Sequence, residues 1–123
     1  RLSVERARLQ AKIRMDEIDF FELYDAYSIF ATLSLESAGF AERGRGWQTA
    51  QNGAAALPIL TMGGLKARGN PWGATGVYQT VEAVLQLRCQ SGDNQIPDAK
   101  WGMAQCFGGP ASTAVTHIFE RIA

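Results

Sequence analysis

Three short loops carry the residues of this chain that are best suited to chemistry. The first is Tyr24-Asp25-Ala26-Tyr27, which directly follows an apolar run. A tyrosine at the end of a strand can donate a hydrogen bond to a carbonyl oxygen, and it can act as a base if its pKa is lowered. The simpler interpretation is that Asp25 caps the following helix and that the two tyrosines are half-buried packing residues.

The second loop is rich in glycine, because Gly63-Gly64 is followed by Gly-Asn-Pro-Trp-Gly-Ala-Thr-Gly at residues 69–76. Glycine lets the backbone approach a ligand without interference from Cβ. A helix that begins near Trp72 offers unpaired N–H groups to an anion or a developing oxyanion. Asn70, held before a proline, is well placed to donate a hydrogen bond. The alternative is a tight loop before a helix, since the motifs of phosphate-binding and dinucleotide-binding loops are absent from the sequence.

The third loop begins with Cys106-Phe107-Gly108-Gly109. A thiol at a strand end can transfer protons if it ionises readily, although most free cysteines are small buried hydrophobic residues. Cys89, at a helix end, is interpreted as incidental. One histidine, His117, and two distant cysteines give no zinc spacing, and the alternation around His117 is typical of a packed or surface residue. We therefore predict no metal site.

An α/β arrangement must position these loops. The pattern predicts a helix over residues 3–14, capped by Ser3, and a short buried strand over residues 18–23. A second helix follows the first loop, runs through Ser37 and is stopped by Gly39.

The second half of the chain is predicted to hold one helix and a β-hairpin. Residues 41–56 contain glycines and polar groups and are expected to form an exposed loop, and residues 57–61 a short extended segment. A helix then runs to about Arg88. Its apolar face is expected to consist of Val77, Val81, Val84 and Leu85. Residues 100–107 and 111–120 read as two antiparallel strands.

The composition is that of one globular domain. The 123 residues are 46% hydrophobic and 20% charged, with a formal net charge of +0, which argues against binding to nucleic acid or anionic lipid. No apolar run has the length of a membrane span. Two cysteines do not make a disulfide framework, so a reduced, cytoplasmic setting is expected.

Together, the three loops resemble the C-terminal motifs of the thiolase family, above all of its archaeal and sterol-carrier-protein-x types. Residues 18–27 are similar to a strand that ends in a His-Asp-Ala-Phe-like motif, and residues 35–40 to the Leu-Glu-x-x-Gly-Phe that follows it. Residues 63–76 resemble the Gly-Gly…Gly-His-Pro-x-Gly-Ala-Thr-Gly loop, which is the most specific signal. Residues 106–108 match the Cys-x-Gly motif.

This resemblance implies Claisen-type carbon–carbon chemistry on acyl-CoA thioesters, with coenzyme A as part of the substrate and no permanently bound cofactor. A cysteine nucleophile in the N-terminal half takes the acyl group, and Cys106 would inherit the proton-transfer role. Asn70 stands where the family has a histidine that helps to bind the thioester oxygen, and Tyr24 where it has Asn or His. The further positions expected to bind substrate are Tyr27, Gly69, Gly108 and Gly109.

The resemblance also implies a thiolase-like layered α-β-α fold with a mixed sheet. Residues 1–123 would form part of the C-terminal domain, without the half that bears the nucleophile. Because the chain starts at Arg1 rather than Met, we expect a piece of a longer protein. It should expose an apolar face that meets the N-terminal half, and we expect a homodimer or a tendency to associate.

Departures from the family motifs leave three functions open. The first is a thiolase-type acyltransferase, although Asn70 cannot change its charge near neutral pH as a histidine can. The second is a retro-aldol lyase for β-hydroxyacyl-CoA of the steroid side-chain type, which uses Tyr24 or Tyr27 and works with a small OB-fold partner protein. The third is a non-catalytic interaction domain with a degraded site.

Overall fold

The computed structural model describes residues 1–52 and 57–122. Its helices and strands are α1 (Leu2–Ala11), β1 (Phe20–Glu22), α2 (Ser28–Ala38), α3 (Gly46–Gln51), α4 (Gly64–Arg68), α5 (Thr75–Leu87), β2 (Trp101–Gly108) and β3 (Thr113–Glu120). Short 3-10 turns lie at Met15–Glu17, Trp72–Ala74 and Gly92–Asn94. The strand order is β1-β2-β3, with β1 parallel and β3 antiparallel to β2. The predicted α/β class, mixed sheet and C-terminal hairpin are confirmed.

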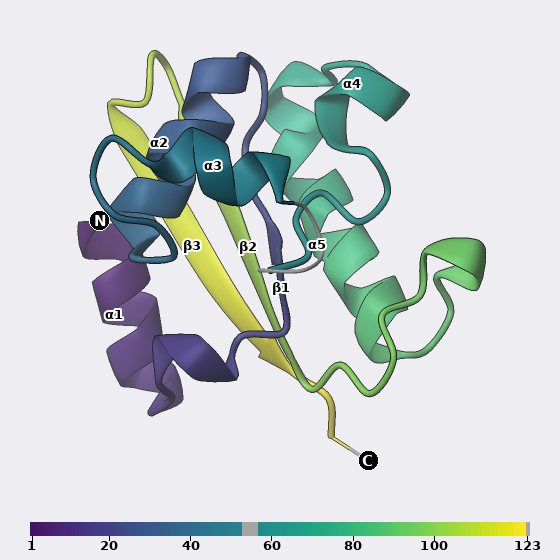
Figure 1. The fold of residues 1–123 in the computed structure, drawn as a ribbon. Coiled ribbons are helices and arrows are strands. Elements are labelled where there is room, and N and C mark those ends of the chain that lie inside the picture. Colours follow the sequence, from purple (N-terminus) through teal and green to yellow (C-terminus); the bar gives the residue numbers. More distant parts are fainter. Residues whose placement is uncertain (53–56, 123) are drawn as a thin grey trace.

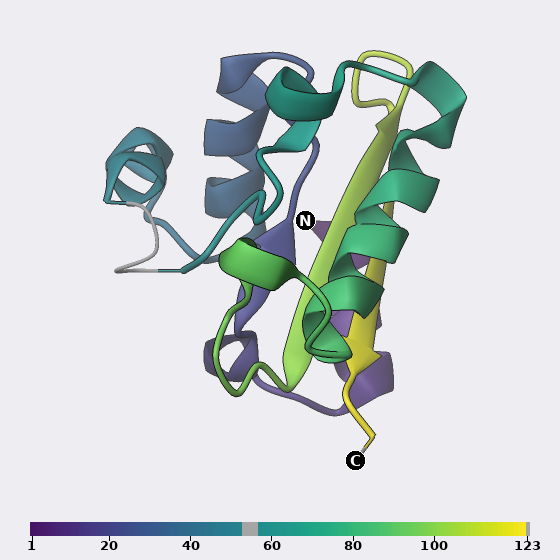
Figure 2. The ribbon, with the colours of Figure 1, turned by 90° about the vertical axis from the view of Figure 1, so that its right-hand side faces the viewer.

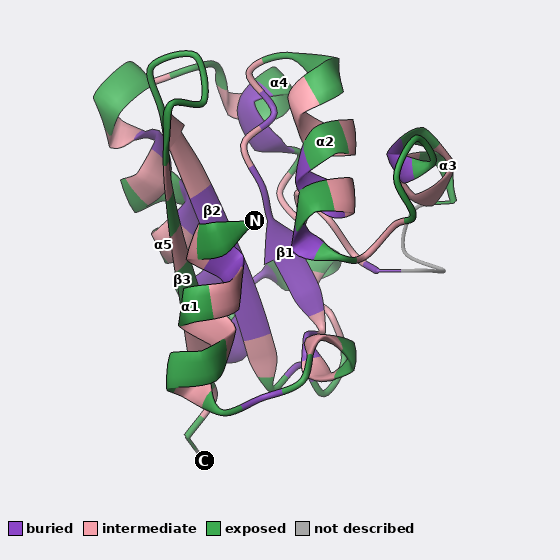
Figure 3. Ribbon diagram, turned by 90° about the vertical axis from the view of Figure 1, so that its left-hand side faces the viewer, coloured by how far each residue is buried: buried purple, intermediate pink, exposed green. Residues whose placement is uncertain are grey.

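Helices cover both faces of this sheet, with α1 and α2 on one side and α5 on the other (Figures 1 and 2). Alternation along β1 divides the core between the two faces. Phe21 packs in a cluster with Leu35 of α2, whereas Phe20 packs in a second cluster with Ala83 and Leu87 of α5. Strand β1 is buried throughout, while β3 alternates between exposed and half-buried residues (Figure 3). The expected layered α-β-α architecture is thereby confirmed.

Phe20 and Gly102 are paired in the register of β1 and β2 and pack closely against each other. A Cβ atom added to Gly102 would lie 2.2 Å from Cζ of Phe20. The phenyl ring therefore occupies the space that a side chain at position 102 would need, and only glycine fits beneath it.

Ser3 has a role other than the one that the sequence predicts. Helix α1 begins at Leu2, and its N-cap residue is Arg1, which makes no side-chain capping hydrogen bond. The Oγ atom of Ser3 lies instead 2.9 Å from Oγ1 of Thr116 on β3. The predicted Ser3 cap is wrong, because its hydroxyl joins α1 to the sheet.

The predicted end of α2 is confirmed, whereas the predicted loop over residues 41–56 is wrong in part. Gly39 follows α2 in the left-handed conformation, with a φ of 94°. Residues 46–51 form helix α3, and residues 53–56 lie outside the described part of the chain. The N–H of Gly46 donates to Glu36 Oε1 at 3.0 Å. A contact with α2 thus supports the start of α3, and local sequence does not reveal it.

Helix α5 presents its valines outward. Val77, Val81 and Val84 are 63%, 51% and 36% exposed. The residues that α5 buries are largely polar and consist of Thr75, Gln79, Glu82, Ala83, Gln86 and Leu87. The prediction that these valines form the buried face of α5 is therefore wrong. The polar side chains that α5 does bury must find hydrogen-bond partners within the domain.

Candidate functional site

The three loops that the sequence singles out lie at one edge of the sheet. Because β1 and β2 are parallel, their carboxyl ends reach the same edge, which is where α/β proteins bind ligands. Residues 24–27 follow β1 there, and residues 106–109 lie at the end of β2. The 69–76 loop reaches the same edge between α4 and α5, at the top of Figures 1 and 2.

Asp25 joins the first loop to the second. Its carboxylate accepts hydrogen bonds from the backbone N–H of Leu65 at 3.0 and 3.2 Å. It does not cap α2, whose N-cap residue is Tyr27 without a side-chain capping bond. Gly64 lies directly against Asp25, since an added Cβ would be 2.6 Å from Oδ2. The interpretation of Asp25 as the cap of the following helix is wrong, because this carboxylate holds α4.

Gly64→Ala should destabilise the protein by about 3 kcal/mol, as read from its free energy of unfolding in urea. The left-handed φ of 62° makes a side chain unfavourable, typically by about 1–2 kcal/mol. The new methyl group would in addition displace the Asp25 carboxylate. Gly44→Ala is the matched control, because Gly44 also has a positive φ of 81° but nothing lies within 4 Å of an added Cβ. Equal losses in the two variants would refute the close contact with Asp25.

Gln79 holds the carboxyl ends of β1 and β2 together. Its Nε2 group donates to the carbonyl oxygens of Leu23 at 2.8 Å and of Gln105 at 3.0 Å. The side chain is 1% exposed. Sequence analysis missed this residue because it assigned the buried face of α5 to the valines. The spacing of Thr75, Gln79 and Gln86 at helical intervals was the available signal.

Cys106 of β2 lies against Gly76 at the start of α5. A Cβ added to Gly76 would be 3.4 Å from Cβ and 3.6 Å from Sγ of Cys106. The thiol lines a cavity of about 380 Å³ together with Gln79 and His117. Burial raises the pKa of Cys106, so the thiol keeps its proton at neutral pH. His117, which the sequence suggests to be a packed or surface residue, is exposed and lines the same cavity.

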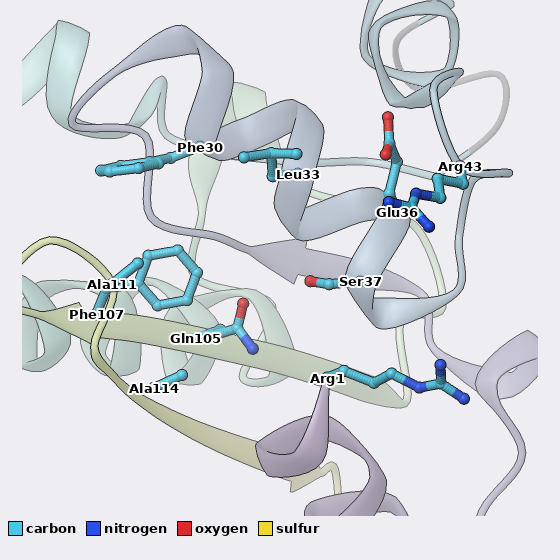
Figure 4. Close-up of a pocket in the computed structure, with 10 residues that line it drawn as sticks. All are labelled: Arg1, Phe30, Leu33, Glu36, Ser37, Arg43, Gln105, Phe107, Ala111 and Ala114. Carbon is cyan, nitrogen blue, oxygen red and sulfur yellow. The ribbon is translucent and has the colours of Figure 1, made fainter.

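Tyr24 packs against two aromatic rings, those of Phe107 and Phe30. Its ring centroid lies 5.6 Å from that of Phe107 and 6.1 Å from that of Phe30. Phe30 and Phe107 line a groove of about 490 Å³ between α2 and the β2–β3 hairpin (Figure 4). Tyr27 is 68% exposed and meets Phe30 edge-on. Tyr24 is thus a neighbour of the residue that follows Cys106, and a shared site with Asn70 stays a prediction.

Asn70 is exposed, and its own loop orients its side chain. Oδ1 accepts a hydrogen bond from the backbone N–H of Trp72 at 3.0 Å, and Thr75 Oγ1 lies 3.4 Å away. Because the oxygen is engaged in the loop, the Nδ2 amide is the group available to a ligand. This orientation suits the predicted role as a hydrogen-bond donor.

The glycines predicted to bind substrate adopt different conformations. Gly69 and Gly109 have φ values of 85° and 57°, which favour glycine for backbone reasons alone. Gly108 is the last residue of β2. Contact of these glycines with a substrate stays a prediction.

A buried charged cluster lies beneath the loops, and the sequence analysis missed it. Arg68 at the end of α4 donates to both carboxylate oxygens of Glu82 on α5, at 2.7 and 2.9 Å. Glu22 of β1 is fully buried and accepts hydrogen bonds from Thr61 N at 2.9 Å and Thr61 Oγ1 at 2.6 Å. Burial raises the pKa of Glu22 to about 7, against the lowering effect of the Thr61 hydrogen bonds. The Glu22 carboxyl is therefore about half protonated near pH 7 and holds its proton below that pH.

Within residues 1–52 and 57–122, no helix is long and apolar enough to cross a membrane. Nor do these residues bring together three or more His, Cys, Asp or Glu side chains that could hold a metal ion.

A mixed sheet thus lies between helical layers, and Cys106 at the end of β2 faces the glycine-rich start of α5. A family model described as "Thiolase C-terminal domain-like" matches residues 1–121. This chain belongs to that family.

Individual relatives agree with this assignment. The chain is 42% identical over 115 residues to an acetyl-CoA acetyltransferase of Methanothermobacter thermautotrophicus, which covers 90% of this chain and 30% of that protein. It is 32% identical over 122 residues to sterol carrier protein 2 of Bos taurus, which covers 94% of the chain and 22% of the relative. The chain thus spans less than a third of the length of these relatives.

The fold has a counterpart among solved structures. The Ltp2-ChsH2(DUF35) aldolase superimposes with a TM-score of 0.81 at 24% identity, over 98% of this chain and 31% of that one. At this level of identity, the likeness concerns the fold alone.

Proposed function

We propose that this chain contributes the C-terminal domain of a thiolase-type acyltransferase that acts on acyl-CoA thioesters. The observation that carries the proposal is the placement of the Cys106 thiol against Gly76 at the start of α5. It is supported by the 42% identity to an acetyl-CoA acetyltransferase. Coenzyme A would enter as part of the substrate, and the acyl-accepting nucleophile would belong to the N-terminal half.

The proton on Cys106 suits the cleavage direction best. When a carbon–carbon bond of a β-ketoacyl thioester breaks, the departing α-carbon becomes an enolate and needs a proton. The protonated thiol can supply it, while the Nδ2 amide of Asn70 donates to the enolate oxygen. In the synthetic direction the thiol must first lose its proton, which its raised pKa disfavours.

Cys106→Ser should lower turnover of an acyl-CoA by the full-length protein by about 10²- to 10⁴-fold, the usual value of a positioned proton-transfer group. A covalent acyl adduct should still form, because Cys106 is not the proposed nucleophile. Mass spectrometry of the protein during turnover measures the adduct, and a coupled assay measures the rate. Cys89→Ser is the control, since Cys89 is exposed and lies at the other end of α5. Absence of any acyl adduct in the unchanged protein would reject the acyltransferase.

A retro-aldol lyase is the second candidate, and the residues at positions 24 and 70 favour it. Asn70 cannot exchange a proton as histidine can, and Tyr24 offers a hydroxyl instead. In that case Tyr24→Phe should abolish activity on a β-hydroxyacyl-CoA while Cys106→Ser retains it. A small OB-fold partner protein is part of this proposal. Failure of both substrates to react would leave a non-catalytic interaction domain.

The exposed face of α5 supports a proposed interface with the N-terminal half. Val77 and Val81 are more than half exposed, and Val115 of β3 is 48% exposed. All three line the cavity that also contains the Cys106 thiol. Exposed apolar side chains that are grouped in this way mark interaction surfaces. We propose that the N-terminal half of the same protein covers this face, and that the whole protein is a homodimer.

A further inference from the structure

Arg68 is placed to control the loop that carries Asn70. It is the last residue of α4, so only Gly69 separates it from Asn70. Its Nη1 atom binds both carboxylate oxygens of Glu82, and its guanidinium carbon lies 5.6 Å from the ring centroid of Tyr78. Since Tyr78 and Glu82 are four residues apart on α5, both contacts fix the end of α4 against one face of that helix.

The Arg68–Glu82 pair is shielded from water. The two side chains are 13% and 10% exposed, and Nε and Nη2 of Arg68 have no hydrogen-bond partner among the described residues. A buried pair of this kind adds little net stability, because desolvation offsets the attraction between the charges. Its more informative effect is geometric, since two charges in a poorly solvated site hold each other in one arrangement.

Glu22 of β1 is buried within reach of the charges of this pair. One of its carboxyl oxygens accepts from Thr61, and the other is buried without a hydrogen-bond partner among the described residues. Burial and, to a smaller extent, the negative charge of Glu82 raise the pKa of Glu22, whereas the positive charge of Arg68 lowers it. A proton on Glu22 therefore relieves the repulsion between the two acids.

We propose that Arg68 and Glu82 are positioning residues, which hold the Asn70 loop against α5 and so determine where the Asn70 amide meets the substrate carbonyl. The catalytic part of this inference rests on the proposed function. Neither residue contacts the substrate, and both act through Asn70 alone.

A double-mutant cycle in the full-length protein tests it. Arg68→Met should lower kcat on an acyl-CoA on the order of 10- to 100-fold, the usual cost of a catalytic group misplaced by about 1 Å, with a smaller change in KM. In an Asn70→Ala background, the same substitution should cause little further loss. Arg68→Lys should restore most of the activity, and Lys66→Met, an exposed change on the same helix, should have no effect. Additive losses in the double variant would overturn the proposal.

A second measurement does not depend on turnover, so it separates this proposal from the proposed function. In protein labelled with ¹⁵N-asparagine, the side-chain amide signals of Asn70 are identified by their absence in Asn70→Ala. Arg68→Met should shift or broaden them, whereas Lys66→Met should leave them in place. If Arg68→Met does not fold, Glu82→Gln takes its place in both experiments. Unchanged Asn70 signals in these variants would refute the positioning role even in an inactive protein.

Discussion

Gly102→Ala should destabilise the protein by about 3 kcal/mol, at the upper end of the usual cost of overpacking. The added methyl carbon would lie 2.2 Å from Cζ and 2.8 Å from both Cε atoms of Phe20. Phe20 is fully buried and is enclosed by Ala83 and Leu87 of α5 and by Ala99. The ring has no open space into which it can move, so strand and helix must separate. Urea unfolding of the variant and the unchanged protein measures the difference.

Two further variants isolate the cause of this effect. Gly73→Ala is the control, because nothing lies within 4 Å of a Cβ added there; it should change the free energy of unfolding by less than about 0.5 kcal/mol. The double variant Phe20→Leu/Gly102→Ala should lose less free energy of unfolding than the sum of the two single variants, because leucine leaves room for the methyl group. Full additivity would show that the ring and Gly102 do not compete for space.

Glu22→Gln should remove most of the pH dependence of stability between about pH 4.5 and pH 7. The pKa of Glu22 rises from 4.5 to about 7 on folding. The folded protein therefore binds more protons than the unfolded chain in this window, and stability falls as the pH rises. A shift of this size lowers the free energy of unfolding by about 3 kcal/mol once the pH is above the folded pKa. Below about pH 4.5, where both states are protonated, this loss is absent. Glutamine mimics the protonated acid at every pH.

The measurement is the free energy of unfolding at several pH values for both proteins. The curves should run close together below about pH 4.5, separate between about pH 4.5 and pH 7, and stay apart above that range, with the variant more stable by about 3 kcal/mol. Glu42→Gln is the control, because the Glu42 side chain is 83% exposed and pairs only loosely with Arg45 at 3.4 Å. A variant that keeps the slope of the unchanged protein would show that Glu22 does not hold the proton.

Much of the fold could be predicted because local signals agree with tertiary structure. Alternation and aromatic content locate β1, the glycine turn locates the β2–β3 hairpin, and Gly39 ends α2 as its conformational freedom suggests. Helix α3 could not be predicted, since its support comes from Glu36, ten residues away. The orientation of α5 was also hidden, because its buried face gains stability from hydrogen bonds and charges rather than from apolar area.

The candidate site divides in the same way. The sequence identifies the loops of Tyr24, Asn70 and Cys106 by residue type, and the parallel pair β1–β2 brings them to one edge. It does not identify Gln79 or the Arg68–Glu82 pair. Their partners are backbone carbonyls and charges more than ten residues away, and a buried polar side chain looks in sequence like a solvated one.

The two hydrogen bonds of Gln79 restrict which amino acids can replace it. Its side-chain amide donates one hydrogen to the carbonyl of Leu23 and the other to that of Gln105. A hydroxyl side chain has a single hydrogen to donate, and asparagine is one methylene shorter. Lysine would bring a positive charge into a buried position. In a deep mutational scan, position 79 should therefore be as intolerant as the aromatic core, although its residue type is that of an ordinary surface helix.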